Sequence, residues 1–371
     1  MDAPRILLIR TSALGDIVHA LPALTALRRH LPKARIAWVV EKAFAPLLES
    51  HADLDQVLTI NTKGWRQRPL AAETWREMGR FMSELDGFGA EIALDLMGNY
   101  KGTLIAMLAL CDRRIGISKR WRREPASAAW LTDTVPPNGR HAVNQALAVA
   151  GALGLPTEPA DFGGDRLGSS SQLSDETEDC SVILHPGTGW ANKTYPPERW
   201  GEVTRLIAKE TGRDTWVSAG PGENRLADRV VSSSQGHAHC LDDPSLDDLV
   251  ERLRHADLVL GGDTGPIHLA HALGVSVLSV MGPTDPERNG PYGAPERTVS
   301  QRLPCSFCHR RLDSVKACLL EIPPHLVASR AVELLRESMR SSSGTPRRRG
   351  EAGPAGSREA QARRAPWDTG P

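Results

Sequence analysis

The chain of 371 residues is 40% apolar and 24% charged, enough to build two or three ordinary domains without disulfides or a structural metal. No apolar run approaches the roughly 18 to 20 residues that a membrane-spanning helix needs, so composition excludes both a small disulfide-stapled scaffold and a membrane-spanning protein. The formal net charge is zero overall, but it is +4 over residues 1–160, −7 over 161–340 and +3 over 341–371. The positive charge of the first part indicates either an anionic partner there or an ordinary solvated surface.

The chain begins with a short strand-like run that lacks the long apolar region of a signal peptide, and its six cysteines are scattered. We therefore expect a soluble cytosolic protein with reduced thiols. Apolar runs rich in Val, Ile and Leu then alternate with helix-period segments, a pattern typical of parallel strands joined by crossover helices. In the first part we predict strands at residues 5–10, 34–41, 57–60, 91–96 and 114–118.

Residues 154–180 are dense in Gly, Pro, Ser and acidic residues and predict a linker. A second set of strands is predicted at 181–185, 214–219, 257–260 and 275–281, with helices near 198–211, 224–233, 247–254 and 267–273. These patterns predict an α/β protein of two doubly wound domains, 1–160 and 161–340, facing a central cleft. Residues 341–371 hold one large apolar residue, Trp367, and predict a disordered tail.

The first candidate site lies in residues 5–32, where a buried strand runs through a loop with Gly15 into a helix. Asp16 is then expected at the carboxyl end of a strand, where open α/β sheets place ligands, and it can accept a proton from a hydroxyl there. Asp16 as a mere helix cap and His19 as a competing base are the alternatives. The single glycine, in place of G-x-G-x-x-G, argues against a nicotinamide-dependent dehydrogenase.

The second candidate site lies in residues 182–200, where a strand ends in a loop rich in glycine and hydroxyl residues before a helix. Backbone N–H groups, Thr188 and Lys193 are expected to surround an anion such as a diphosphate. A solvent-facing Lys193 is the alternative.

The third candidate site lies in residues 261–293, where a strand leads into a helix through Asp263, Thr264 and Gly265. The N–H groups at the helix start fit a phosphate, whereas the Asp263 carboxylate fits sugar hydroxyls, so a ligand carrying both is expected. His268 either contacts that ligand or is an ordinary helix histidine.

In this order and spacing the three segments resemble glycosyltransferase family 9, the lipopolysaccharide heptosyltransferases, over residues 5–339. The specific stretches are the loop ending at 15–16, GDTG at 262–265 and GPTDP at 282–286. DLMGNYK at 95–101, REP at 123–125, HAV at 141–143 and LG at 153–154 look closer to heptosyltransferase I than II. The resemblance implies the GT-B fold of two Rossmann-like domains, an ADP-heptose donor and inversion at the anomeric carbon.

The resemblance also implies roles for individual residues. It places the general base at Asp16, and the donor contacts at Gly15, Thr188, Lys193, Glu223, Asp263, Thr264, Gly265 and His268. The first domain would bind the acceptor and the second the nucleotide sugar.

The implied acceptor is the Kdo-lipid A inner core of lipopolysaccharide, whose phosphates and carboxylates require cations. Lys101, Arg120 and Arg123, together with Lys119, Arg122 and Trp121, are expected to supply that surface, although a purely solvated basic turn is the alternative. A lipid acceptor implies peripheral contact with the cytoplasmic face of the inner membrane through charge and Trp. Neither nucleic acid nor a cofactor is expected.

Two departures from the family pattern stand out. Tyr195 replaces a frequent Trp, and Cys305-x2-Cys308 with Cys318 and His309 offers zinc ligands. A single C-x-x-C without a second pair is a weak signal, so we predict no metal. Two other classes stay open: another GT-B transferase or nucleotide-sugar epimerase with a different donor, and a non-catalytic nucleotide-sugar binding protein.

Overall fold

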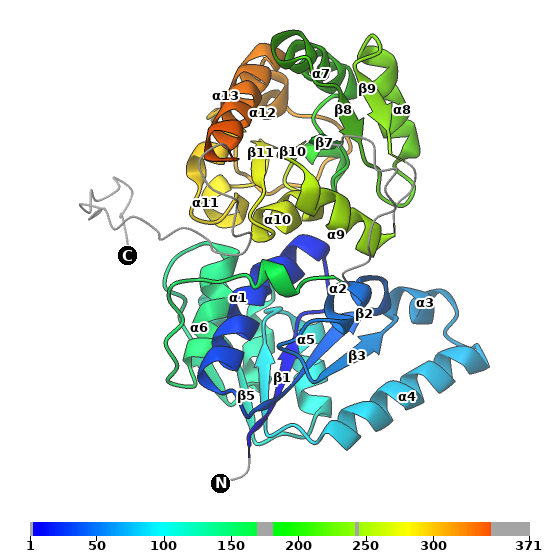
Figure 1. Ribbon diagram of the computed structural model, residues 1–371. Coiled ribbons are helices and arrows are strands. Elements are labelled where there is room, and N and C mark those ends of the chain that lie inside the picture. The colour runs from blue at the N-terminus through cyan, green and yellow to red at the C-terminus, as the bar shows by residue number, and fades with distance from the viewer. Residues whose placement is uncertain (1–2, 169–180, 242–244, 343–371) are drawn as a thin grey trace.

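The computed structural model describes residues 3–168, 181–241 and 245–342. Figure 1 shows two α/β units, one above the other, with the first strands and helices of the chain in the lower unit. No helix within the described ranges is long and apolar enough to cross a membrane.

The first unit is built on a six-stranded parallel sheet with the strand order β3-β2-β1-β4-β5-β6. Its strands are β1 (Arg5–Ile9), β2 (Arg35–Glu41), β3 (Gln56–Ile60), β4 (Ile92–Asp95), β5 (Arg113–Ile117) and β6 (Asp133–Val135). Its helices are α1 (Leu14–His30), α2 (Pro46–Glu49), α3 (Thr62–Gln67), α4 (Ala72–Phe88), α5 (Tyr100–Leu108) and α6 (Ala142–Gly151). Helices α1 and α6 pack in the apolar core on one face of this sheet, and α4 and α5 pack on the other.

The second unit repeats this plan with the strand order β12-β11-β10-β7-β8-β9, also parallel. Its strands are β7 (Val182–His185), β8 (Thr215–Val217), β9 (Ala238–Cys240), β10 (Leu258–Gly261), β11 (Ser276–Met281) and β12 (Thr298–Ser300). Its helices are α7 (Pro197–Thr211), α8 (Asn224–Ser233), α9 (Leu246–His255), α10 (Gly265–Ala272), α11 (Pro286–Asn289), α12 (Ala317–Leu320) and α13 (Pro324–Ser342). The predicted doubly wound α/β architecture is confirmed.

The nine predicted strands are present within one or two residues of the expected bounds. Three strands were missed, β6, β9 and β12; each has three residues and lies at an edge of its sheet. Edge strands are partly exposed, so they lack the continuous apolar run that marks a central parallel strand. Helix α13 was also missed, and because it ends at Ser342 it enters the predicted tail; residues 343–371 lie outside the described residues.

The predicted linker is partly a packed segment. Phe162 contacts the rings of His271 and Tyr292, Leu167 is buried, and Arg166 forms an ion pair with Asp53 at 2.5 Å. These contacts hold residues 161–168 against both units, which composition alone does not indicate. The remainder, residues 169–180, lies outside the described residues.

The two units meet at the N-terminal ends of α1 and α10, and their apolar residues share one core. A Cβ atom on Gly15 would lie 2.7 Å from Cδ2 of His268, and one on Gly265 would lie 2.7 Å from Cβ of Leu14. Glycine at both positions therefore permits the close approach of the two helix ends. Because α1 follows β1 and α10 follows β10, this contact brings together the carboxyl edges of the two sheets.

Candidate active site

Asp16 lies in the first turn of α1, beside the contact between the two units. Its Oδ1 forms an ion pair with Nη2 of Arg10 at 2.6 Å, and the backbone N–H of Ala13 donates to Oδ2 over a long 3.4 Å. The side chain is 39% exposed, so Oδ2 is only weakly engaged and open to a substrate hydroxyl. Arg10 directly follows β1 and was not predicted as a site residue. The sequence feature that could have identified it is a charged residue at the end of an apolar strand.

A buried polar chain crosses from the second unit to the first. Lys193 Nζ lies 2.7 Å from Asp263 Oδ2, His268 Nε2 lies 3.1 Å from Asp263 Oδ1, and His268 Nδ1 lies 3.2 Å from His19 Nε2. All four side chains are almost fully buried. The structure thus brings together predicted donor contacts from two distant segments, Lys193 from one and Asp263 and His268 from the other, and links them to His19.

The titration of this chain has clear physical causes. Burial alone would raise the pKa of Asp263, but the hydrogen bond from His268 and the charge of Lys193 hold it well below its usual range. Burial, followed by the neighbouring His268 and His141, lowers the pKa of His19 well below its usual value. His19 is therefore neutral near pH 7, and its Nδ1 is buried without a partner among the described residues. Of the two candidate bases, Asp16 is the accessible one.

The loop after β7 lies beside the loop that carries Asp263. The Thr188 hydroxyl donates to the carbonyl of Trp190 at 2.8 Å, and a Cβ on Gly262 would lie 2.9 Å from Thr188 Cγ2. Lys193 Nζ lies 4.9 Å from the centroid of the Trp190 ring, a cation–π contact. The predicted grouping of Thr188 and Lys193 with the third segment is present.

Glu223 begins α8 and reaches the same edge of the second sheet. Its Oε2 accepts the N–H of Gly220 at 2.9 Å and lies 3.5 Å from Nε2 of His185. A Cβ on Gly187 would lie 1.9 Å from Glu223 Oε2, so only glycine leaves room for this carboxylate. Burial lowers the pKa of His185 to about 4, so this ring is neutral at pH 7.

The N-terminus of α10 lacks a side-chain cap. Thr264 is the N-cap residue, but its side chain makes no capping hydrogen bond, and Gly265 and Pro266 follow. No N-cap side chain satisfies the N–H groups of this first turn, and a helix N-terminus favours a phosphate or other anion. Asp263, paired with Lys193, directly precedes this helix start in the sequence.

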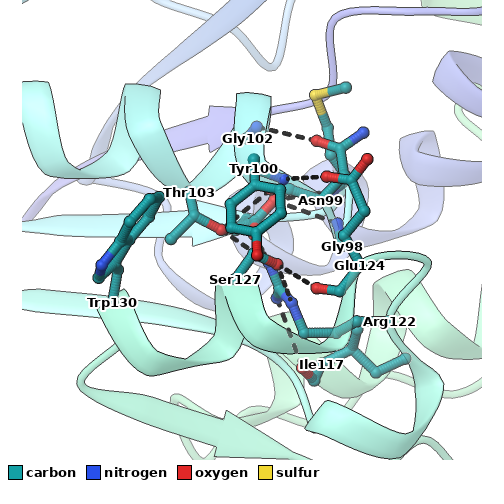
Figure 2. Close-up of polar contacts among 12 residues, drawn as sticks. Gly98, Asn99, Tyr100, Gly102, Thr103, Ile117, Arg122, Glu124, Ser127 and Trp130 are labelled. Carbon is teal, nitrogen blue, oxygen red and sulfur yellow. Dashed lines mark hydrogen bonds and ion pairs between the residues drawn. The ribbon is translucent and has the colours of Figure 1, made fainter.

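The predicted acceptor cations behave differently from one another. Lys101 Nζ forms an ion pair with Glu41 at 2.5 Å, whereas Arg120 and Arg123 are exposed. Arg122 corrects an expectation: its side chain is fully buried and forms a 2.6 Å ion pair with Asp95. Figure 2 shows Arg122 beside two of its other hydrogen-bond partners, Ser127 and Ile117. Its charge pairs with Asp95 inside the first unit, so it is not available to bind an acceptor.

Tyr195 and the cysteine loop have structural roles in the described residues. The buried Tyr195 hydroxyl donates to the carbonyl of Ile322 at 2.7 Å, which anchors the segment after Lys193. Cys308 Sγ lies 2.9 Å from Lys316 Nζ, and Cys318 is buried. No group of three or more His, Cys, Asp or Glu suited to a metal ion occurs within the ranges that the structure describes.

Sequence reasoning missed one further residue that joins the two units. His141, the N-cap of α6, packs its ring 5.2 Å from that of His19, and its Nε2 lies 2.9 Å from the carbonyl oxygen of Gly290. It belongs to the HAV stretch, which was noted only for its resemblance to a subfamily. Burial lowers the pKa of His141 to about 4.

Comparisons with known proteins agree with this geometry. The model of the family "Glycosyltransferase family 9 (heptosyltransferase)" matches residues 78–319. The lipopolysaccharide heptosyltransferase 1 of Pseudomonas aeruginosa is 31% identical over 318 residues, covering 83% of this chain and 86% of the relative. The protein of the same name from Escherichia coli K12 is 29% identical over 293 residues, covering 78% and 91%.

Solved structures show the fold. The E. coli heptosyltransferase WaaC with ADP has a TM-score of 0.74 at 24% identity, covering 90% of this chain and 99% of that one. The E. coli ADP-heptose heptosyltransferase II has a TM-score of 0.68 at 18% identity over the same shares. The GT-B fold implied by the resemblance is confirmed. With two thirds of the chain matched by the family model, this protein belongs to glycosyltransferase family 9, the heptosyltransferases, and is a glycosyltransferase.

Proposed function

We propose that this protein transfers heptose from ADP-heptose to the Kdo-lipid A inner core of lipopolysaccharide, with inversion at the anomeric carbon. The observation that carries the proposal is the position of Asp16, whose accessible carboxylate lies where the N-terminus of α1 contacts His268 and the N-terminus of α10. The relatives named lipopolysaccharide heptosyltransferase 1 support this substrate class. A similar WaaC structure holds ADP-2-deoxy-2-fluoro heptose, which supports the donor.

In this proposal the second unit, residues 161–340, binds the donor. Lys193, the Thr188 hydroxyl and the N–H groups of Thr264 and Gly265 bind the diphosphate. Because the Lys193 ammonium already faces Asp263 at 2.7 Å, the pair is nearly neutral and the N-terminus of α10 must supply part of the attraction.

The remaining donor contacts are proposed for the sugar and nucleoside ends. Asp263 keeps lone pairs on both oxygens beyond its bonds to Lys193 and His268, and it accepts hydrogen bonds from heptose hydroxyls. Glu223, whose side chain is 28% exposed, contacts the nucleoside part, and Gly15, which packs against His268, contacts the donor through its backbone.

The reaction is then a single displacement. Asp16 takes the proton of the acceptor hydroxyl, and the acceptor oxygen forms a bond to the anomeric carbon while the bond from that carbon to the ADP oxygen breaks. ADP leaves with the electron pair toward Lys193 and the N-terminus of α10, which stabilise the developing charge. Arg10 holds Oδ1 of Asp16 and so directs Oδ2 toward the acceptor.

The first unit, residues 1–160, is proposed to bind the acceptor. Lys101, Arg120 and Arg123 follow β4 and β5, so they lie at the same edge of the sheet as Asp16. Their cations bind the phosphates and carboxylates of the inner core. A lipid-anchored acceptor places the enzyme at the cytoplasmic face of the inner membrane as a peripheral protein.

The test measures ADP release from purified protein given ADP-heptose and Kdo2-lipid A. Asp16→Asn, nearly isosteric, is expected to lower kcat by about 10² to 10⁴ while the melting temperature changes little. His19→Ala is the control for the competing base. Near-wild-type turnover of Asp16→Asn would show that Asp16 only caps the helix and is not the general base. Turnover of the donor in the absence of an acceptor would favour an epimerase. Binding of the donor without release of ADP would favour a non-catalytic binding protein.

A further inference from the structure

Helix α5 is apolar on the side that faces solvent. Ile105 and Ala106 pack into the core of the first unit, while Tyr100, Leu104 and Leu108 are exposed on the other side, with Met107 beside them. Positions four residues apart lie on one helix face, so these side chains form a stripe along α5. A helix that is apolar on both sides is normally covered on both, but within the described residues the outer face of α5 stays 38% to 51% exposed at these four positions.

The stripe continues into neighbouring elements. The ring of Trp130 lies 5.5 Å from that of Tyr100, and the two labelled rings stand side by side in Figure 2. Leu110, two residues beyond α5, is the most exposed residue of this group. We call this group the α5 patch, and its members are 38% to 84% exposed: Tyr100, Leu104, Met107, Leu108, Leu110 and Trp130. Scattered apolar residues on a surface need no explanation, but exposed apolar side chains repeated along one helix face, with Trp130 against its first ring, indicate a contact surface.

Cations adjoin one end of the α5 patch. The turn of residues 119–123 exposes Lys119, Arg120 and Arg123, and the carboxylate of Glu124 accepts the N–H of Tyr100 at 2.7 Å. That hydrogen bond ties the basic turn to the first residue of α5. The patch is thus an apolar stripe with an aromatic pair and three cations at one end.

The basic turn is also held rigidly beneath its surface. The Arg122 side chain is fully buried. Its Nη2 lies 2.6 Å from Asp95 Oδ2, and its Nε donates to the Ser127 hydroxyl at 2.9 Å. Ser127 belongs to the same short helical segment as Trp130. The basic turn, the aromatic pair and the start of α5 are therefore joined by hydrogen bonds into one preorganised surface; Figure 2 shows Tyr100, Glu124, Arg122, Ser127 and Trp130, which make these connections.

We propose that the α5 patch docks on a bilayer containing anionic phospholipids, with its apolar side chains at the boundary between headgroups and acyl chains. Exposed leucines with a Tyr–Trp pair and adjacent cations match that boundary, because aromatic rings favour the interface and cations bind lipid phosphates. A second copy of the chain fits less well, since a twofold contact through the patch would bring two sets of cations together.

This proposal names the surface through which the enzyme would reach a lipid-anchored acceptor, and in that respect it rests on the proposed function. The patch begins beside Arg120 and Arg123, the residues proposed to bind the anionic inner core. Docking there would hold the headgroup of a membrane-embedded acceptor beside the edge of the sheet that carries Asp16. Binding of vesicles by the patch can be measured whether or not any heptose is transferred.

The test is flotation of the full chain with vesicles of phosphatidylcholine, with and without phosphatidylglycerol. Wild type is expected to float with the anionic vesicles, and Leu104→Ser/Leu108→Ser is expected to lower the partition coefficient by about tenfold or more, from the lost apolar burial. The matched control is Leu320→Ser/Leu326→Ser on the second unit, whose side chains are 41% and 46% exposed. Equal binding by the α5 variant and wild type would overturn the proposal.

Two further measurements separate the alternatives. ADP release with the acceptor in vesicles is expected to fall in the α5 variant, while release with a deacylated, soluble acceptor is retained. If wild type transfers heptose to neither acceptor, the proposed function fails and the vesicle result stands by itself. A wild-type dimer in sedimentation velocity that becomes monomeric in the α5 variant would show a protein interface and overturn the lipid assignment.

Discussion

Replacing Arg122 tests whether the buried ion pair with Asp95 stabilises the first unit and orders the basic turn. Both side chains are completely buried, and the guanidinium also contacts the hydroxyl of Thr103 at 2.7 Å and that of Ser127 at 2.9 Å. Arg122→Met keeps much of the volume but leaves the Asp95 carboxylate buried without its cation.

The magnitude follows from what remains around the carboxylate. Removing one partner of a buried pair costs about 3 to 5 kcal/mol. Asp95 keeps the N–H groups of Met97 at 3.0 Å and Gly98 at 3.3 Å, so the low end, about 3 kcal/mol, is expected. For a unit of this size a loss of about 3 kcal/mol lowers the melting temperature by about 6 to 12 °C.

The assay combines thermal unfolding with kinetics. Arg122→Met is expected to raise the KM for the acceptor, because the turn that presents Arg120 and Arg123 loosens, and to leave donor affinity unchanged. Arg113→Met is the matched control: its pair with Asp133 is about half exposed and 3.5 Å long, so its loss should cost less than about 1 kcal/mol.

A second substitution tests whether the unpaired carboxylate of Asp95 causes the loss of stability. Adding Asp95→Asn removes the uncompensated charge, so the double variant should be more stable than Arg122→Met alone. A loss below about 1 kcal/mol in Arg122→Met, or no recovery in the double variant, would show that the pair does not stabilise the unit as argued.

Four further outcomes are expected. Lys193→Ala weakens both ADP and ADP-heptose in calorimetry, because its ammonium faces the diphosphate. Asp263→Ala weakens ADP-heptose much more than ADP, since it loses sugar contacts and also releases Lys193; equal losses would contradict the sugar assignment. Arg120→Gln/Arg123→Gln raises the acceptor KM and leaves donor affinity unchanged, because each charged hydrogen bond buried by the acceptor contributes about 1.5 to 3 kcal/mol. The effect decreases as the salt concentration rises. An unchanged KM at low salt would show that the turn is a solvated surface that does not bind the acceptor. Burial lowers the pKa of His141 to about 4, so below about pH 6.5 the unfolded chain binds a proton that the folded chain does not. The free energy of unfolding is then full above pH 6.5 and falls toward pH 4, and denaturant titrations of His141→Asn should show a flatter decline; an unchanged slope would assign the acid sensitivity to other groups.

The central strands and the loops that follow them were predictable from the sequence because they depend on local physics. A strand buried on both faces of a parallel sheet must be a continuous apolar run, as residues 182–185 and 258–261 are. Ligand loops then follow at the carboxyl ends, which places Asp16 and residues 262–265 at the site before any contact is known. Three of the four edge strands, β6, β9 and β12, carried no such run and were missed.

Only the tertiary structure decided which of these side chains touch. His19 and His268 are 249 positions apart and lie 3.2 Å from each other, and Arg122 is buried between exposed Arg120 and Arg123 in a single basic run. Residue type sets what a group can bind, but its burial depends on which distant segments pack over it. For the same reason α5, which is apolar on both sides, keeps Leu104, Met107 and Leu108 38% to 51% exposed within residues 3–168, 181–241 and 245–342.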